Sequence, residues 1–179
     1  MKDCNCGYCA GGEKLADCTI ESGKLGEEEI FAHIQTGSWK AAFRDILDEQ
    51  TLERCTQIEK ATAMYRRLFT QGIGHGYLLR VDGKPHCIAW WDAARDGEEG
   101  GAELICIHSL PDNWGKGYGT KMMEAVLSDI RAAGYSRVVL WVFEENRRAR
   151  HFYEACGFAP NGRTKTGLGA VEVCCEKNL

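Results

Sequence analysis

Three glycines at alternate positions are the residues of this chain whose spacing most clearly suits the binding of a ligand. Gly115, Gly117 and Gly119 follow an apolar run that ends at Leu110, and they precede a helical pattern over residues 121–133. Glycine lets a backbone approach a ligand closely, and the first N–H groups of a helix have no partner within the helix. The helix dipole adds positive charge at the same end, so the segment predicts a cradle for a pyrophosphate.

A phenol lies downstream of the glycine segment. Tyr153 stands 34 residues after Gly119, in a helical pattern over residues 147–155 that ends at Gly157. A nearby phenol can protonate a departing thiolate, whose conjugate acid has a pKa of about 8.5. A phosphate cradle and a proton donor together indicate a group-transfer enzyme with a nucleotide-tailed cofactor. The alternative is that Tyr153 only packs, although Phe152 already supplies a packing face.

Hydrophobic periodicity predicts the elements that must position these residues. Apolar residues at helical spacing predict helices over residues 27–36, 39–47, 50–69, 120–133 and 147–155. Alternating or continuous apolar runs predict strands over residues 18–21, 75–81, 86–91, 103–110, 137–143 and 170–176. Strand–helix–strand order favours a parallel pair, and the Asp82–Gly83 hairpin favours antiparallel pairing. We therefore predict an α/β (α+β mixed) fold with one mixed, mostly antiparallel sheet of six to seven strands and helices on both faces.

Composition limits the classes of protein to which the chain can belong. Its 179 residues suit one domain, 44% are hydrophobic, and the net charge of −4 argues against a broad nucleic-acid surface. A local basic cluster at residues 147–150 is either a solvated helix start or an anchor for cofactor phosphates. No apolar run approaches the roughly 20 residues that span a bilayer. We predict a cytoplasmic protein, monomeric or homodimeric, without a nucleic-acid or membrane partner.

Nine of the ten cysteines fall into two groups. Six lie within apolar or periodic segments, where a reduced cysteine packs as a small hydrophobic residue. Cys4, Cys6 and Cys9 lie in a glycine-rich tract, so residues 1–14 are predicted to be a cysteine-rich extension ahead of one domain over residues 15–179. Their spacing could bind zinc or act as a redox tag, but a closed zinc site needs four ligands. We predict no metal.

Residues 102–158 resemble the acyl-CoA-binding core of the GNAT N-acetyltransferases. The phosphate motif of that family, Gln/Arg-x-x-Gly-x-Gly/Ala, aligns here with residues 114–119, with Trp114 at the first position. The second motif, Asn-x-x-Ala-x-x-Phe-Tyr-x-x-x-Gly-Phe, is matched from Asn146 to Phe158. Two motifs at the family's separation, each on the expected element, indicate a GNAT fold.

The resemblance implies an acetyltransferase with acetyl-CoA as co-substrate. The acetyl group would pass to a primary amine of a small molecule or peptide by direct attack in a ternary complex. The resemblance also implies that Tyr153 lies near the thioester sulfur and that Asn146 touches the cofactor arm. The cofactor-binding residues that it implies are Ile107, His108, Ser109, Gly115, Lys116, Gly117, Tyr118, Gly119, Thr120 and Asn146.

Two residues are candidates for the base that takes the proton of the amine, whose pKa is about 10.4 in lysine. Glu103 lies 14 residues before Gly117, which resembles the placement of the catalytic glutamate in histone-type members of the family. Its apolar neighbours are expected to raise its pKa. The alternative is a salt-bridged carboxylate at a strand start. His108 is the second candidate, unless it is simply hydrogen-bonded in place.

Trp39, Trp91 and Glu98 are predicted to line the acceptor site. Acids in the loop over residues 96–99 would attract a cationic amine, unless the loop is only a solvated turn. Core packing is the expected role of at least one of Trp90 and Trp91, because neighbours on a strand face opposite sides. Two other functions stay open: a non-catalytic acyl-CoA sensor, and a metal or thiol protein centred on the N-terminal cysteines.

Overall fold

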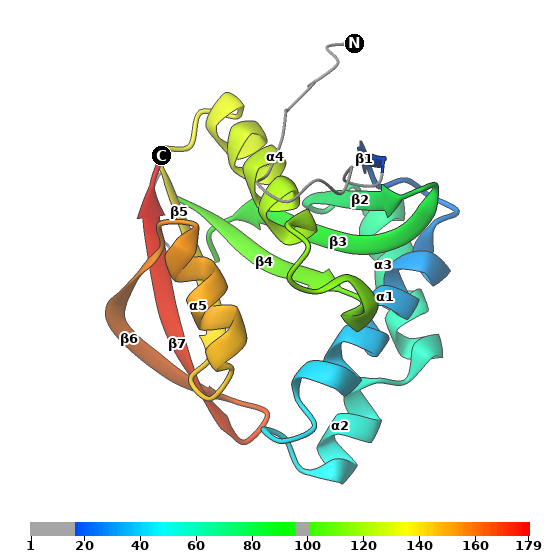
Figure 1. Ribbon diagram of the computed structural model, residues 1–179, viewed down its shortest axis with the longest axis horizontal. Helices are drawn as coiled ribbons and strands as arrows, with labels where there is room; N and C mark the ends of the chain where they lie inside the picture. The colour runs from blue at the N-terminus through cyan, green and yellow to red at the C-terminus, as the bar shows by residue number, and fades with distance from the viewer. Residues whose placement is uncertain (1–16, 96–100) are drawn as a thin grey trace.

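Seven strands form one sheet in the computed structural model, which describes residues 17–95 and 101–179. The strand order is β1-β2-β3-β4-β5-β7-β6 (Figure 1). The strands are β1 (Cys18–Ser22), β2 (His75–Val81), β3 (Lys84–Ala93), β4 (Gly101–Ser109), β5 (Arg137–Phe143), β6 (Ala159–Gly167) and β7 (Ala170–Asn178). β4 and β5 pair parallel and all other neighbours pair antiparallel, which confirms the predicted mixed sheet.

Helices cover both faces of this sheet, as predicted. They are α1 (Glu28–Ala42), α2 (Glu49–Cys55), α3 (Ile58–Gln71), α4 (Tyr118–Ala132) and α5 (Arg147–Ala155), with a short 3-10 helix η1 (Pro111–Asn113). α4 and α5 lie over the face turned to the viewer in Figure 1. α1 and α3 pack against the opposite face.

Side-chain alternation along β3 produces two separate cores. Ile88 and Trp90 point to the core under α1 and α3, together with Leu78 of β2. Trp91 points to the core under α4 and α5, together with Leu79 of β2. Both tryptophans are buried, on opposite faces of one strand, which confirms the expected alternation.

β4 and β5 are paired only near one end. Their parallel register joins Gly101–Glu103 to Arg137–Val139, and the two strands diverge beyond these residues (Figure 1). β5 stays bonded to β7 along its whole length. The facing edges of residues 104–109 and 140–143 therefore have no strand partner across the divergence.

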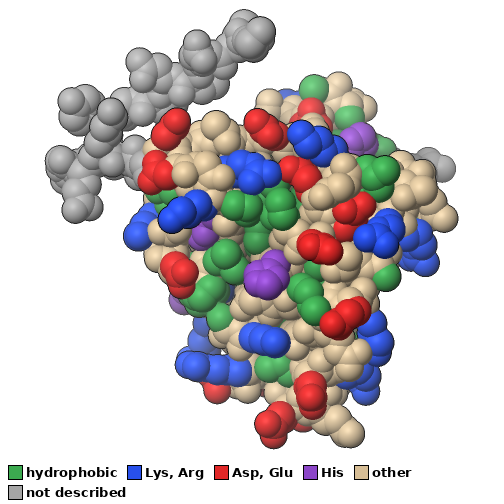
Figure 2. Space-filling model, turned by 90° about the vertical axis from the view of Figure 1, so that its right-hand side faces the viewer, with side chains coloured by type: hydrophobic (Ala, Val, Ile, Leu, Met, Phe, Trp, Pro, Cys, Tyr) green, Lys and Arg blue, Asp and Glu red, His purple; other side chains and the backbone are tan. Residues whose placement is uncertain are grey.

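Acidic and basic side chains are interspersed on the surface that faces right in Figure 1, which Figure 2 shows from the front. The predicted extension over residues 1–14 and the predicted acceptor residue Glu98 lie outside the described residues. Within residues 17–95 and 101–179, all seven cysteines are free and no cluster of three or more His, Cys, Asp or Glu side chains could hold a metal. In the same residues, no helix is long and apolar enough to cross a membrane.

Candidate active site

A cavity of about 440 Å³ lies over the start of α4. The end of β4, the turn before α4 and one face of α5 form its wall. Seven of the residues that the sequence assigns to cofactor binding line it: Ile107, Ser109, Gly115, Gly117, Tyr118, Gly119 and Thr120. We call this space the cofactor-side cavity.

The start of α4 offers a run of free backbone donors to this cavity. Gly115 and Gly117 have φ angles of 77° and 83°, which other residues rarely adopt. Gly117 is the N-cap of α4, and no side chain caps the helix there. The first helical hydrogen bond runs from the Lys121 N–H to the Gly117 carbonyl, and no acceptor among the described residues pairs with the N–H groups of residues 115–120. Unpaired donors at a helix N-terminus suit an anion.

Trp114, at the first position of the glycine motif, is held by two contacts. Its indole N–H donates to the Ser109 carbonyl at 3.0 Å. The Arg148 guanidinium lies 3.2 Å from the centre of its ring. Arg148 lines the cavity, so one member of the basic cluster at residues 147–150 is placed beside the free amides. Burial lowers the pKa of Arg148, but a guanidinium stays charged at neutral pH.

A second cavity, of about 550 Å³, lies between α1, α3, the divergent strands and the turn joining β6 to β7. Aromatic side chains from several elements line it: Trp39, Phe43, Tyr65, Trp90, Trp141 and Phe143. We call it the acceptor-side cavity. Five residues line both spaces, so the two cavities meet there: Ser38, Ile107, Arg148, Ala149 and Tyr153.

Tyr153 of α5 lies at this junction. Its ring packs against Phe152 and Phe158, and its burial raises the pKa of the phenol well above 10. The phenol therefore keeps its proton throughout the physiological pH range. No hydrogen bond joins its hydroxyl to another of the described residues. The hydroxyl is thus available to a ligand in either cavity.

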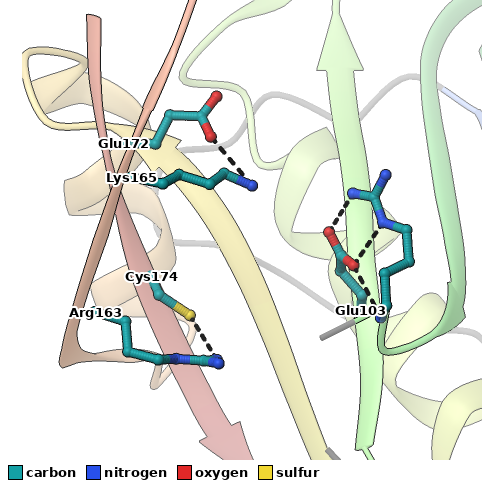
Figure 3. Close-up of polar contacts among 6 residues, drawn as sticks. Glu103, Arg163, Lys165, Glu172 and Cys174 are labelled. Atoms are coloured by element: carbon teal, nitrogen blue, oxygen red, sulfur yellow. Dashed lines mark hydrogen bonds and ion pairs between the residues drawn. The ribbon is translucent and has the colours of Figure 1, made fainter. Parts of the chain in front are cut away.

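Glu103 differs from its predicted environment. The side chain is 4% exposed and lines neither cavity. Arg95 binds both of its carboxylate oxygens, with Nε to Oε2 at 2.8 Å (Figure 3). Burial alone would raise the pKa of Glu103, but the hydrogen bonds and charge of Arg95 outweigh burial and lower it. The expected rise in pKa is wrong, and the alternative of a salt-bridged carboxylate describes the residue.

His108 lines the acceptor-side cavity and is hydrogen-bonded in place. Its Nε2 accepts from the Trp39 indole N–H at 3.2 Å. Burial lowers the pKa of His108 to about 4, so the ring is neutral near pH 7. Since its Nε2 already accepts this hydrogen bond, His108 is better suited to fixing the orientation of Trp39 than to taking a proton from the amine. Binding of the cofactor arm by the backbone of His108 stays a prediction.

Comparison with known proteins identifies the family. The family model described as acetyltransferase (GNAT) family matches residues 40–158. The chain belongs to the GNAT family. Over 85 residues it is 35% identical to mycothiol acetyltransferase of Beutenbergia cavernae, a stretch covering 47% of this chain and 28% of that protein. Over 74 residues it is 36% identical to an uncharacterised N-acetyltransferase of Mycobacterium bovis, covering 41% of this chain and 47% of that protein. The chain thus spans less than half the length of either curated relative.

Solved GNAT structures share the whole architecture. PaiA N-acetyltransferase from Thermoplasma acidophilum, in complex with coenzyme A, has a TM-score of 0.77 at 16% identity, covering 91% of this chain and 99% of that one. A GNAT-family acetyltransferase from Streptococcus pneumoniae has a TM-score of 0.68 at 16% identity, covering 91% and 99%. These similarities confirm the predicted GNAT fold.

The two predicted acceptor tryptophans of this GNAT chain lie in different places. Trp39 lines the acceptor-side cavity, and its contact with an acceptor stays a prediction. Trp91 is 1% exposed, donates its indole N–H to the Tyr77 hydroxyl at 3.2 Å and stacks on His75. The prediction for Trp91 is wrong, because the alternation of β3 turns it into the core under α4. Its neighbour Trp90 lines the cavity instead.

Three predicted cofactor residues have other contacts in this GNAT site. The Lys116 ammonium donates to the Asn113 side-chain oxygen at 2.8 Å and lies outside the cofactor-side cavity. Asn146 caps α5 by accepting from the Ala149 N–H at 3.2 Å, and it lines the acceptor-side cavity. The Tyr118 ring is buried in the core, where it packs edge-to-face against His86. Binding of the cofactor by these three residues stays a prediction.

Sequence reasoning missed several residues that line the two cavities, among them Ser38 and Leu168. Ser38 of α1 lines both cavities, and Leu168 lines the acceptor-side cavity from the β6–β7 turn. The glycines on either side of Leu168 were a signal for a turn. Nothing in the sequence singles out Ser38, whose position depends on the packing of α1 over β4.

Proposed function

We propose that the chain is an acetyl-CoA-dependent N-acetyltransferase that transfers an acetyl group to a primary amine by direct attack in a ternary complex. The observation that carries this proposal is the junction of the two cavities at Tyr153. One cavity offers free amides and an arginine to a phosphorylated cofactor. The other offers an aromatic space to the amine. Membership of the GNAT family and the coenzyme A bound by PaiA support the same activity.

Acetyl-CoA fits the donor groups of the cofactor-side cavity. The unpaired N–H groups of residues 115–120 suit the pyrophosphate, and Arg148 adds positive charge beside them. The unpaired edge of β4 over residues 104–109 offers backbone groups to the amides of the pantetheine arm. A cofactor bound in this way carries its thioester along β4 toward Tyr153.

The ammonium form of the amine first loses one proton to water. The reaction of the neutral amine then exchanges a C–S bond for a C–N bond and moves one proton from nitrogen to sulfur. The amine nitrogen attacks the thioester carbon, the thiolate departs, and the proton lost by nitrogen ends on sulfur. Tyr153 is a hydrogen-bond donor to the developing thiolate, because its raised pKa keeps the phenol protonated. The amine's proton passes to water, since Arg95 holds Glu103 and the Nε2 of His108 is occupied. The proton then returns through the phenol to sulfur.

Direct attack also agrees with the state of the thiol in the acceptor-side cavity. Cys106 lines the acceptor-side cavity, and burial raises the pKa of its thiol to about 12. A thiolate rather than a thiol is the nucleophile in acyl transfer. Cys106 is therefore poorly suited to forming an acyl-enzyme.

Replacing Tyr153 by phenylalanine tests the proposal. We expect Tyr153→Phe to slow turnover about 10²- to 10⁴-fold, the usual contribution of a positioned proton donor, with the affinity for coenzyme A unchanged. Product mass reports turnover, and calorimetry reports binding. Tyr135→Phe is the matched control, because Tyr135 lies against Trp91 and lines neither cavity.

Two outcomes contradict the proposal. Unchanged turnover in Tyr153→Phe removes the proposed role of the phenol. If the unaltered protein binds coenzyme A but acetylates none of a broad panel of amines, the chain is a non-catalytic acyl-CoA-binding module.

A further inference from the structure

The turn between β6 and β7 has an unfavourable backbone conformation at a large side chain. Leu168 and Gly169 have φ angles of 54° and 86°, and they lie between the paired residues Gly167 and Ala170. Two central residues with positive φ form a type I′ hairpin turn, which favours asparagine or aspartate followed by glycine. Leucine has no polar side chain that would compensate for the left-handed conformation.

The same chain contains a hairpin of this type with the favoured residues. Asp82 and Gly83 join β2 to β3 with φ angles of 48° and 75°. The Asp82 carboxylate accepts a hydrogen bond from the Asp17 N–H at 3.1 Å. The β6–β7 turn thus has leucine at the position that aspartate fills in the β2–β3 turn.

Core packing does not account for Leu168. The side chain is 39% exposed and belongs to neither core. It does line the acceptor-side cavity, together with aromatic residues of α1 and β5. Unfavourable backbone conformations that the rest of a fold maintains are concentrated at ligand sites. The position of Leu168 therefore points to contact with the acceptor.

The charges around the acceptor-side cavity limit the acceptors that suit it. Among the described residues, its charged lining residues are Arg67, Arg95, Arg148, Asp92 and Glu172. Arg95 is already paired with Glu103. Glu172 is already paired with Lys165 at 3.3 Å, as Figure 3 shows. A polyamine or aminoglycoside carries several positive charges and needs an excess of acids. With the paired Arg95 and Glu172 set aside, the described lining holds two arginines and one acid, so these residues suit an acceptor with one amine.

We propose that the acceptor is a monoamine with a compact aromatic or branched apolar body, and that Leu168 is a specificity-determining residue for it. This inference rests on the proposed N-acetyltransferase function. The amine lies toward Tyr153, where the cavities meet, and the apolar body lies against Leu168 and the aromatic wall. The cavity volume of about 550 Å³ is in the usual range for small-molecule sites.

Leu168→Asn separates the conformational role of this position from its contact with the acceptor. The variant creates the favoured Asn-Gly turn, so we expect its Tm to rise by a few degrees. It also removes apolar contact, so we expect the KM for phenethylamine and tryptamine to rise about tenfold or more. The KM for acetyl-CoA should stay unchanged. A residue with only a structural role would raise Tm without affecting the amine.

Two further variants complete the test. Asp82→Leu makes the reverse change in the matching turn, and we expect a lower Tm with an unchanged KM for phenethylamine. Leu168→Met keeps an apolar side chain and should retain most of the affinity. An unchanged KM for apolar amines in Leu168→Asn overturns the role of Leu168. A higher kcat/KM for spermidine than for phenethylamine in the unaltered protein overturns the acceptor class.

Equilibrium binding distinguishes failure of this inference from failure of the proposed function. Calorimetric titration of phenethylamine into the protein saturated with coenzyme A requires no turnover. If binding is weaker in Leu168→Asn while no amine is acetylated, the cavity assignment holds and the enzymatic function fails. If phenethylamine does not bind the coenzyme A complex at all, the inference fails whether or not another amine is acetylated.

Discussion

Arg95 and Glu103 link β4 to the end of β3 beside the divergence of β4 and β5. Because the pKa of Glu103 is lower in the folded chain, this group stabilises the fold above its unfolded pKa, near 4.5, and loses that contribution as pH falls through the folded value. We expect Glu103→Gln to lower the free energy of unfolding by about 1–3 kcal/mol at pH 7. The difference should be smaller at pH 3 than at pH 7, because this contribution is lost progressively as the pH falls below the unfolded pKa. Urea denaturation at the two pH values measures it.

The same variant also tests whether Glu103 is the catalytic base. A carboxylate that lines neither cavity should leave the pH profile of kcat/KM with its original shape. Glu154→Gln, at an exposed position of α5, is the control for a lost surface charge. If turnover slows by about a hundredfold or more without loss of folding, and one limb of the pH profile disappears, Glu103 is the base after all.

The sequence could predict residue positions wherever a local pattern determines them. The free amides at residues 115–120 follow from glycine spacing and the start of a helix, and the Asp82–Gly83 turn follows from turn chemistry. Trp91 shows the limit of such local patterns. Strand alternation places Trp90 and Trp91 on opposite faces of the sheet, but it does not say which of the two faces a cavity. Likewise, the pKa of Glu103 depends on its contact with Arg95, eight residues away. The hydrophobic pattern of the sequence does not reveal that contact.

At the scale of elements, α4 has a glycine with positive φ at each end. Gly117 is its N-cap with φ 83°, and Gly134 follows its C-cap with φ 91°. A Cβ at either position meets no atom within 4 Å, so alanine introduces only backbone strain. We expect Gly117→Ala and Gly134→Ala each to cost about 1 kcal/mol of stability. Only Gly117→Ala displaces the free amides, so only that variant should weaken coenzyme A binding, by about tenfold or more.

Calorimetry with coenzyme A and thermal unfolding of both variants measure these effects. Gly134→Ala controls for the loss of stability, since Gly134 lies at the far end of α4 and lines neither cavity. Equal affinities in the two variants would show that the N-terminus of α4 does not bind the pyrophosphate.

Element boundaries departed from the predicted pattern where tertiary contacts decide them. The sequence predicts a break near Gly37, but α1 continues through it. A Cβ there would lie 3.1 Å from a methyl of Leu110, so the glycine serves close packing. The predicted helix over residues 50–69 is divided into α2 and α3, because Gln57 has an extended backbone between them.

β6 was missed because its pattern is not that of a buried strand. Most of its residues are exposed and polar, and its pairing with β7 shifts register between Pro160 and Thr164. The acceptor-side cavity was equally inaccessible from the sequence, since its lining comes from elements that only the sheet topology brings together.

At the scale of the whole molecule, the divergence of β4 from β5 divides the sheet into two parts that share three residue pairs. A cofactor bound along β4 and against α4 and α5 would contact both parts. We expect coenzyme A to slow amide hydrogen exchange in residues 104–109 and 115–120. Residues 18–22 of β1, at the far edge of the sheet, should slow much less, because an edge strand exchanges largely through local opening.

Binding to the folded chain alone must also raise its stability with ligand concentration. Coenzyme A at about 100 times its dissociation constant should add about 2.7 kcal/mol to the free energy of unfolding. Hydrogen exchange with mass spectrometry locates the effect, and thermal unfolding over a range of coenzyme A concentrations measures its size. Desulfo-coenzyme A is the matched ligand, because it keeps the pyrophosphate and should protect the same segments. Protection spread evenly over β1 and β2, with none at residues 104–109, would mean that the cofactor binds elsewhere and that the two parts of the sheet are not joined by it.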